Sequence, residues 1–241
     1  CFRDEDARAD RSPGEFYQLD LEMSFVEQED IFQVVEKLMV NLFKLFSSKK
    51  ILNEKFPRIP YHEAMIKYGT DKPDLRNPLI IQDVTDIFSR EDVKFDIFKK
   101  LVKSGSIVRA IVTKNTKDKP RSFFDNIDKW AKEQGASGLA YFTIEKLKEI
   151  SGKGPVGKFF SKESIEEIMK QTGAEVGDSI FLACAKKNEL EKITSLARDK
   201  IGKDLELIND NIFAFCWIVD YPMFERDEVL YKIDFSHNPF S

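Results

Sequence analysis

The sequence predicts an α+β protein in which an α/β domain of residues 90–203 is inserted into a second domain, formed by residues 1–89 and 204–241. Three observations predict this architecture. Residues 16–25 alternate between polar and apolar side chains, residues 28–48 repeat apolar residues at helical spacing, and strand-like and helix-like patterns alternate from residue 90 onward. A run of roughly 110 residues with that alternation is long enough to build its own core.

Composition and charge exclude several classes of protein. The chain has 241 residues, 42% hydrophobic and 33% charged, which is ordinary for a globular protein. With 38 Lys and Arg against 42 Asp and Glu, its net charge is −4, so any RNA contact must come from a local patch. Three cysteines without a CxxC pair argue against a disulfide framework or a cysteine-rich zinc site, and favour a reducing compartment. No apolar run approaches the ~20 residues of a membrane helix.

The two ends of the sequence predict that this is a piece of a longer protein. The chain opens at Cys1 within what resembles a strand, without methionine or signal region, and it closes on residues 238–241 without a helix or cap.

The first 25 residues predict a strand, a loop and an antiparallel strand. Ser12-Pro13-Gly14 is a turn signal, and Phe16, Gln18 and Asp20 fall on one face of the second strand. If the strands pair, Arg3 and Glu5 project toward the same surface. A guanidinium suits phosphate, a carboxylate suits an amine, and a ring suits a purine, so this face is a candidate nucleotide site. The alternative is a salt-bridged surface hairpin with one stray aromatic residue.

The elements that follow are expected in this order. Residues 28–48 form a helix that is apolar on several sides and therefore buried, and residues 61–68 form a short helix before a Pro-rich loop at 69–78. The inserted domain has strands near 107–112, 139–144 and 180–184, and helices near 122–135, 161–172 and 190–202. The helix at 161–172 has a capping-box start at Ser161. Residues 212–219 are almost continuously apolar, which predicts a central strand buried on both faces, and they begin a hairpin that returns at 229–235.

Several segments resemble a known family. Phe2-Arg3-Asp4-Glu5-Asp6, the loop at 8–11 and Glu15-Phe16-Tyr17-Gln18-Leu19-Asp20 resemble motif 2 of class II aminoacyl-tRNA synthetases, in detail the bacterial-type aspartyl-tRNA synthetases. Residues 68–76, 217–225 and 237–240 resemble three further family segments in the family's order. The stretch 90–203, with Gly-Ala-Ser-Gly-Leu-Ala at 135–140, resembles that family's GAD-type insertion domain.

The resemblance implies a fold and an ATP site. The fold is a class II synthetase antiparallel sheet of six strands flanked by helices and interrupted by the insertion. Arg3 would be the catalytic residue, binding the ATP α-phosphate and the substrate carboxylate and stabilising the charge that develops at phosphorus. Asp4 and Glu5 would complete the ATP contact, and Phe16 would stack on adenine. Ser12 stands where other members have an ATP-contacting glutamine.

The resemblance also implies how aspartate and tRNA are bound. Gln18 and Asp20 would line the aspartate pocket, and His237 would close over the aspartate. Arg8 and Arg11 would contact the acceptor end of tRNA. Mg²⁺ would be held mostly by the phosphates of ATP, so no metal-ligand cluster is expected in the chain.

The implied activity is ATP-dependent ligation of L-aspartate to tRNA through an aspartyl-adenylate, in the cytoplasm, by a protein that forms a homodimer. Because the chain shows no motif 1, motif 3 or anticodon-binding segment, we expect it to be inactive alone. Asn238, where many members have a second histidine, suggests that the asparagine tRNA is charged as well.

Two alternatives remain. A similar insertion occurs in a non-catalytic, tRNA-binding subunit of tRNA-dependent amidotransferases, but such a subunit should lack the motif 2-like hairpin. A relative specific for asparagine or lysine is disfavoured by the insertion and by the loop at 71–74. Outside these segments we expect ordinary structural roles, with His62 at the surface, Cys184 and Cys216 in the core, and a solvated basic loop at 114–121.

Overall fold

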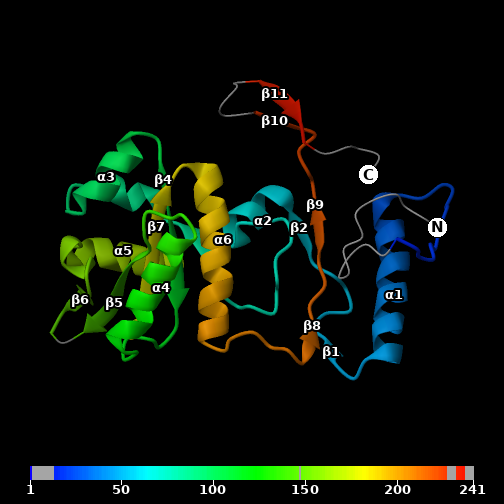
Figure 1. The fold of residues 1–241 in the computed structure, drawn as a ribbon, viewed down its shortest axis with the longest axis horizontal. Helices are drawn as coiled ribbons and strands as arrows, with labels where there is room; N and C mark the ends of the chain where they lie inside the picture. The colour runs from blue at the N-terminus through cyan, green and yellow to red at the C-terminus, as the bar shows by residue number, and fades with distance from the viewer. Residues whose placement is uncertain (2–13, 147, 227–231, 237–241) are drawn as a thin grey trace. The chain divides into compact units, whose positions relative to one another are not determined.

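The structure is a computed structural model that describes residues 1, 14–146, 148–226 and 232–236. It divides into two compact units, residues 1–46 and residues 47–241, and each is described by itself (Figure 1).

Helix α1 (Gln28–Phe46) dominates the first unit, and its bounds agree with the expected helix. Glu29 and Asp30 lie in its first turn and Lys44 in its last, which suits the helix dipole. The expectation that this helix is buried is wrong for the described residues. Val40 is buried, whereas most of the apolar stripe is exposed: Ile31, Val34, Leu38, Leu42 and Leu45.

The strand expected over residues 16–25 is also not formed. Pairing in this segment is confined to its beginning, where the Phe16 amide donates to the Cys1 carbonyl at 3.1 Å and the Cys1 amino group donates to the Phe16 carbonyl at 2.8 Å. The alternating apolar side chains are exposed, including Tyr17, Leu19 and Leu21. A strand is stable only when its backbone groups have partners, and the described residues supply none beyond this one pair.

A five-stranded antiparallel sheet, in the order β3-β4-β7-β5-β6, organises the second unit (Figure 1). Its strands are β3 (Ile81–Asp83), β4 (Ile107–Thr113), β5 (Ala140–Lys146), β6 (Ile150–Lys153) and β7 (Ser179–Ala185). β4 and β7 pair along seven residues, from Ile107↔Ala185 to Thr113↔Ser179. Both central strands are almost entirely buried, as expected for strands covered on both faces.

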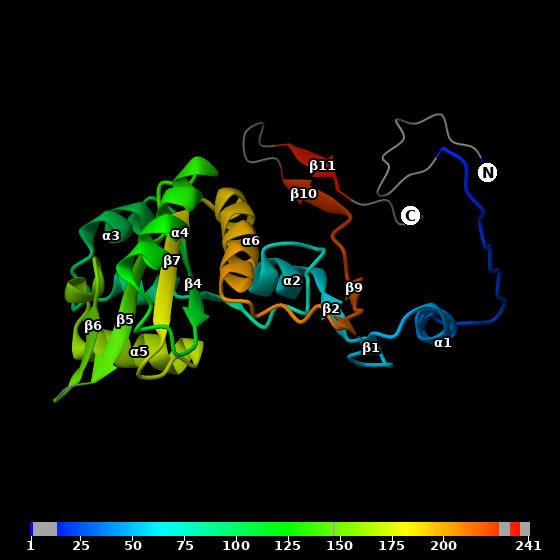
Figure 2. The same ribbon diagram turned by 60° about the horizontal axis from the view of Figure 1, so that its bottom comes forward.

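Helices cover both faces of the sheet, and each face has its own core. The helical elements are η1 (Thr85–Ser89), α3 (Asp96–Lys103), α4 (Arg121–Glu133), η2 (Gly157–Phe159), α5 (Lys162–Thr172) and α6 (Lys187–Asp204). One core joins η1, α3 and α5 to the sheet through side chains such as Phe88, Phe98 and Ile165. The other joins α4 and α6, and Figure 2 shows α4 lying in front of β7.

Local sequence signals explain how these helices begin and end. Ser161 caps α5, since its Oγ accepts the Ser164 amide at 3.0 Å, which confirms the cap expected from the sequence. Gly173 ends the same helix in the left-handed conformation.

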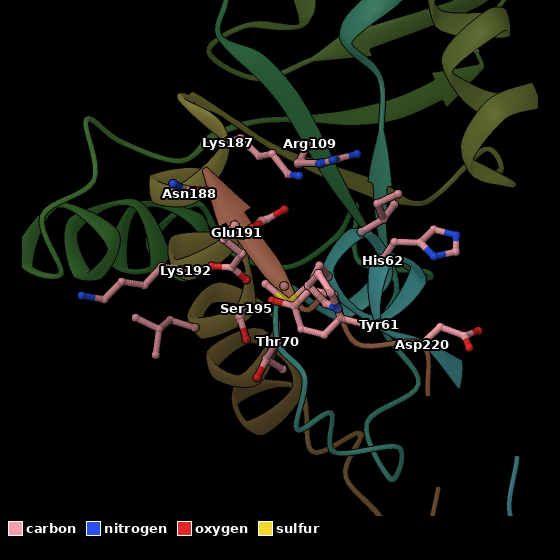
Figure 3. A pocket seen from close by; sticks show the side chains of 16 residues that line it. Tyr61, His62, Thr70, Arg109, Lys187, Asn188, Glu191, Lys192, Ser195 and Asp220 are labelled. Carbon is pink, nitrogen blue, oxygen red and sulfur yellow. The ribbon is translucent and has the colours of Figure 1, made fainter. Parts of the chain in front are cut away.

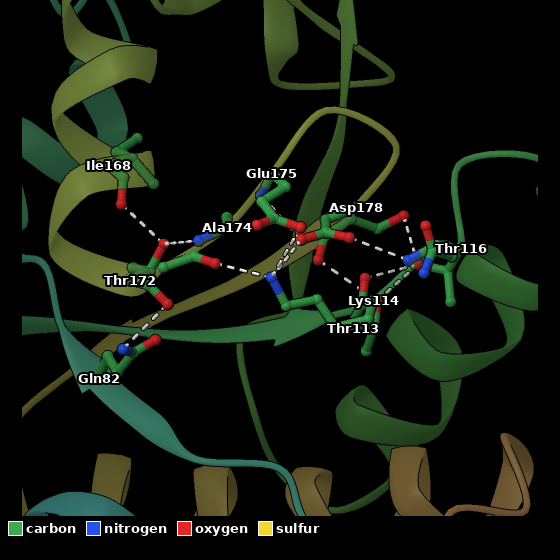
Figure 4. A network of polar contacts seen from close by, with 12 residues as sticks. Gln82, Thr113, Lys114, Thr116, Ile168, Thr172, Ala174, Glu175 and Asp178 are labelled. Carbon is green, nitrogen blue, oxygen red and sulfur yellow. Dashed lines mark hydrogen bonds and ion pairs between the residues drawn. The ribbon is translucent and has the colours of Figure 1, made fainter.

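A buried carboxylate ties the end of α5 to the turn after β4 (Figure 4). Asp178 accepts the amides of Asn115 and Glu175 at 2.9 and 2.8 Å and pairs with Lys114 at 3.0 Å. Lys114 also donates to the Gly173 carbonyl at 2.7 Å. The network satisfies a charge that would otherwise be costly to bury.

The rest of the second unit consists of short strand pairs. β1 (Lys50–Ile51) pairs in parallel with β8 (Ile212–Phe213), and β2 (Arg58–Pro60) with β9 (Trp217–Val219). Helix α2 (Tyr61–Tyr68) follows β2. The single central strand expected over 212–219 is wrong: the run is split into β8 and β9, and its side chains are only half-buried.

The expected hairpin exists, but with a different first strand. It pairs β10 (Phe224–Arg226) with β11 (Ile233–Phe235) instead of residues 212–220 with 229–235. Asp220 adopts a φ of 58°, so the chain turns sharply directly after β9.

The α+β class is confirmed, with helices flanking an antiparallel sheet. The first strand of that sheet is β3, which starts at Ile81 and pairs with β4. Outside it, the described residues form two-stranded pieces, not the six-stranded sheet that the resemblance implies. Within the described part of the chain, no helix has the length and apolar character needed to cross a bilayer.

Candidate functional site

The first candidate site is the extended segment at 16–20. Gln18 and Asp20 project from the same side, and the Gln18 amide Nε2 donates to Asp20 Oδ1 at 2.5 Å. The Cys1 thiol lies 3.7 Å from Gln18 Oε1. Gln18 and Asp20 are exposed and Phe16 is half-buried. The segment therefore offers an oriented carboxylate, an amide and an aromatic ring within five residues, a set suited to an ammonium group and a purine.

Most of the other residues assigned to the site lie outside the described residues. These are Arg3, Asp4, Glu5, Arg8, Arg11, Ser12 and His237. Of the predicted site, the structure therefore places Phe16, Gln18 and Asp20. The convergence of Arg3 and Glu5 with Phe16 stays a prediction.

The second candidate is a cleft of about 1090 Å³ in the second unit (Figure 3). It lies where α2 and the turn after β9 face α6 and β4. Figure 3 shows Arg109 and Lys187 at one end of the view, and Tyr61, His62 and Asp220 toward the other. The sequence did not point to Arg109 or Lys187, because an arginine inside a strand and a lysine at a helix start have no distinctive spacing.

The charges that line this cleft balance. Three cations, Arg109, Lys187 and Lys192, are matched by three carboxylates, Glu191, Asp220 and Glu225. Arg109 is also paired with the Asp83 carboxylate at 2.7 Å. A groove that binds a polyanion such as RNA needs an excess of positive charge, so this lining does not favour a phosphate backbone.

The aromatic end of the cleft is acidic. The rings of Tyr61 and Tyr221 lie 5.0 Å apart, and the Tyr221 hydroxyl lies 3.5 Å from Asp71 Oδ2. Burial, together with the charges of Glu225 and Asp71, raises the pKa of Tyr61. Burial and Asp71 likewise raise the pKa of Tyr221. Both hydroxyls therefore stay protonated near neutral pH and serve as hydrogen-bonding groups, not as bases.

Other expectations about individual side chains can be compared with the structure. His62 is exposed, Cys184 is buried and Cys216 is half-buried. The basic loop is neutralised locally: Lys114 pairs with Asp178 at 3.0 Å, Arg121 with Asp125 at 3.2 Å, and Lys119 lies over the Phe123 ring. These contacts favour a solvated loop over an RNA patch. Within the ranges that the structure describes, no three His, Cys, Asp or Glu side chains are grouped to hold a metal ion.

The loop at 70–79, part of one family-like segment, is rigidly held. Arg76 forms a two-pronged contact with Asp74, at 2.9 Å from Nε and 2.7 Å from Nη2. This contact lowers the pKa of Asp74. Arg76 also forms an ion pair with Asp210 at 3.1 Å. The buried guanidinium of Arg198 donates a hydrogen bond to the Asn77 carbonyl of the loop. The loop, which follows α2 in the chain, thus connects α2 to α6 through these contacts.

Comparison with known proteins identifies the family. The profile of the tRNA synthetases class II (D, K and N) matches residues 1–241. The chain is 80% identical over its whole length to "Aspartate--tRNA(Asp/Asn) ligase" of Pelagibacter ubique (strain HTCC1062), of which it covers 41%. It is 52% identical to the protein of that name from Methylorubrum populi and 55% identical to that from a Wolbachia of Drosophila simulans, covering 40% of each. The chain thus spans about two fifths of the length of these relatives, and it belongs to the class II tRNA synthetases of the D, K and N group.

Proposed function

We propose that the protein carrying this chain ligates L-aspartate to tRNA at the expense of ATP, through an aspartyl-adenylate. The observation that carries the proposal is the 80% identity, along the entire chain, to a protein named as an aspartate–tRNA(Asp/Asn) ligase. The Gln18–Asp20 pair beside Phe16 supports it, because it supplies the groups that an aspartate ammonium and an adenine ring require.

The chemistry needs no protein nucleophile. The substrate carboxylate attacks the α-phosphorus of ATP, which enters with its Mg²⁺ as substrate, and pyrophosphate leaves. The protein's task is to position the reactants and to supply positive charge. In the proposal Arg3 provides that charge at the α-phosphate, Asp4 and Glu5 fix ATP, and Phe16 stacks on adenine.

Asp20 and Gln18 hold the substrate in the same proposal. Asp20 pairs with the ammonium group, and the bond from Gln18 Nε2 at 2.5 Å fixes the orientation of the Asp20 carboxylate. His237 closes the pocket, and Arg8 and Arg11 meet the acceptor end of the tRNA. Ser12 takes the place of the glutamine that contacts ATP in other members of the family. We place the boundaries of the inserted domain near residues 90 and 203 and infer a cytoplasmic homodimer for the whole protein.

We also propose that both the aspartate and the asparagine tRNA are charged. The relatives carry "tRNA(Asp/Asn)" in their names, and Asn238 departs from the paired histidines of many family members. The rival proposal, a non-catalytic tRNA-binding subunit of an amidotransferase, has less support because such a subunit would not need the segment at 15–20.

The test uses the full-length protein. Aspartate-dependent ATP–pyrophosphate exchange should be present in the wild type, and Asp20→Asn should lower kcat/KM for aspartate at least roughly thirtyfold, because the ammonium loses a close charge partner. Glu22→Gln, on the same exposed segment, is the matched control and should stay within about threefold. If the rate of ATP–pyrophosphate exchange does not depend on aspartate, the proposed ligase activity is refuted. If only the aspartate tRNA is charged, the proposed dual specificity is refuted.

A further inference from the structure

Arg198 connects helix α6 to helix α2 and to the loop that follows α2. It comes from α6 and is 1% exposed, so its guanidinium has no access to solvent. Nε donates to the Leu79 carbonyl at 2.6 Å, and Nη2 donates to the carbonyls of Asn77 and Asp74 at 2.6 and 2.9 Å. The guanidinium also lies over the Tyr68 ring at 5.0 Å. A single side chain thus reaches the last residue of α2 and three carbonyls of the next loop.

The loop also donates a hydrogen bond to α6, through the side chain of Asn77. Asn77 Nδ2 donates to the Arg198 carbonyl at 3.0 Å, while Asn77 Oδ1 accepts the Leu79 amide at 3.1 Å. One turn further along α6, Gly202 leaves the space that Asn77 fills, since a Cβ at Gly202 would lie within 3 Å of the Asn77 side-chain amide. Arg198, Asn77 and Gly202 therefore form one interlocked contact.

The carboxylate that pairs with Arg198 is that of Asp199, at 3.5 Å, and its side chain is 48% exposed. The shorter hydrogen bonds of the guanidinium all go to backbone carbonyls. A buried cation held mainly by backbone carbonyls is costly, and a lysine, with one donor head, cannot reproduce the planar fork that reaches three acceptors. The guanidinium therefore fixes a particular path of the loop, which an apolar side chain of the same length would not do.

The contact continues from α6 through α2 to the β2–β9 pair. Gly69 ends α2 against α6, where a Cβ would lie 2.4 Å from the Glu191 carbonyl. Helix α2 starts directly after β2, and β2 pairs with β9, from Arg58↔Trp217 to Pro60↔Val219. β9 leads along the chain through the β10–β11 hairpin to His237. From α6 to β9, each link in this series is a backbone contact or a close packing contact, and from β9 onward the link is the order of the chain.

We propose that Arg198 is a positioning residue, which fixes α2 and the β2–β9 pair to α6 and so sets the point from which the chain continues, after β9, to His237. The positional claim rests on the contacts above, and its consequence for aspartate binding rests on the proposed function. A second family-like segment, residues 68–76, thereby acquires a role that needs no contact with substrate.

Hydrogen exchange in the full-length protein tests the positional claim. Arg198→Lys and Arg198→Met are compared with Lys200→Met, which removes a partly exposed cation paired with Asp204 on the same helix. In both Arg198 variants the amides of Asn77 and Gly69 should exchange roughly tenfold faster or more, while amides of β4 and β7 keep their protection. Lys200→Met should leave all of these rates within about twofold.

Aspartate kinetics test the consequence. In ATP–pyrophosphate exchange, Arg198→Lys should raise KM for aspartate roughly tenfold and leave KM for ATP within about threefold, because His237, a proposed aspartate contact, follows β9 in the chain, whereas the proposed ATP contacts all lie before residue 17. Equal changes in KM for aspartate and KM for ATP would overturn the proposal, and so would an equal increase in amide hydrogen exchange in the sheet. Either result would mean that Arg198 contributes only to the overall stability of the fold. If the wild type shows no aspartate-dependent exchange, the proposed function fails, and the amide rates still decide the positional claim.

A milder pair of variants covers the case in which Arg198 variants do not fold. Gly202→Ala pushes against Asn77 and should speed exchange of the same loop amides several-fold. Adding Asn77→Ala removes the obstructing amide, so the double variant should exchange no faster than Asn77→Ala alone. Independent, additive effects would contradict the interlock.

Discussion

Two regions of the second unit are stabilised in different ways. In the sheet, β4 and β7 pair along seven residues and are buried on both faces by helices that come from the same stretch of chain. Outside it, β1 pairs with β8 over two residues and β2 with β9 over three. The first region carries an extensive core of its own, whereas the second combines these short pairs with the packing of α2 on α6 and the stacked rings of Phe56 and Phe215, 4.9 Å apart. A local alternation of strands and helices is therefore sufficient for one region and not for the other.

The hairpin shows the difference most clearly. The rings of Phe224 and Phe235 meet edge to face at 6.0 Å, yet they remain 58% and 53% exposed. Phe142 in β5 is 0% exposed and stacks on Phe160 at 5.0 Å. The two pairs of rings are chemically alike and differ in how far they are buried.

The largest expected effect is the loss of Phe142. Phe142→Ala removes a fully buried ring from the core between the sheet and α5 and should lower the free energy of unfolding by about 3–5 kcal/mol. Phe224→Ala removes the same group from the hairpin and should cost less than about 1 kcal/mol. Urea unfolding at constant m value measures both. Similar costs at the two positions would abolish the distinction between the regions.

The next largest expected effect concerns the packing of α2 on α6, which connects the two regions. Gly69 and Gly173 both end helices in the left-handed conformation, with φ of 67° and 66°. At Gly173 an added Cβ meets nothing within 4 Å, whereas at Gly69 it meets the Glu191 carbonyl at 2.4 Å. Gly173→Ala should therefore cost only the backbone term of about 1–2 kcal/mol.

Gly69→Ala should cost roughly 1 kcal/mol more than Gly173→Ala, because α2 must move away from α6. The difference between the two variants, from paired thermal or urea unfolding, isolates the packing of α2 on α6. Equal costs would show that this packing yields easily.

The elements that the sequence predicted well are those whose signals are local. The helices at 28–46, 61–68 and 162–172 follow from periodicity and capping, and the Ser161 cap forms as expected. Three strands of the sheet, β4, β5 and β7, were also located, because their apolar runs are bounded by turns, whereas the short strands β3 and β6 were not predicted. The strand order, β3-β4-β7-β5-β6, has no local signal and could not be predicted.

The errors concern elements whose partners are not local. The alternation at 16–25 predicts a strand, and the apolar run at 212–219 predicts a buried strand. Neither pattern, however, identifies the strand with which the segment would form hydrogen bonds. Among the described residues, the first pairs through its backbone only at Phe16, and the second is divided into β8 and β9. The stripe of α1 is apolar for the same reason and remains exposed.

The candidate site divides in the same way. Spacing correctly placed Gln18 and Asp20 on one side, because side chains two residues apart in extended backbone share a face. Arg198 could not have been found from spacing, since its three acceptors lie about 120 residues earlier in the chain and are backbone carbonyls, which every residue possesses. Long-range contacts of that kind leave no pattern in a single sequence.

The smallest expected effect lies within the sheet region and depends on pH. Arg90 binds Asp92 through Nε at 2.8 Å and Nη2 at 3.1 Å, and the Ser161 hydroxyl donates to Asp92 at 2.6 Å. These hydrogen bonds, that of Arg90 first, lower the pKa of Asp92 from 3.8 to about 2. A carboxyl whose pKa is lower in the folded state stabilises the fold fully above its ordinary value, and the contribution is lost as the pH falls from there toward 2.

Asp92→Asn should therefore be less stable than the wild type at about pH 5, and the two proteins should converge at about pH 2. Because Asp92 and Arg90 are 31% and 39% exposed, solvent screening keeps the difference below about 1 kcal/mol. Urea unfolding of both proteins across this range measures it, with Glu63→Gln on the exposed face of α2 as the control for a lost surface carboxylate. A constant gap between wild type and Asp92→Asn would mean that the carboxyl acts through its shape and not its charge. The small size expected here, against the cost of removing Phe142, follows from the same comparison: in this region the buried apolar core, and not the surface ion pairs, determines stability.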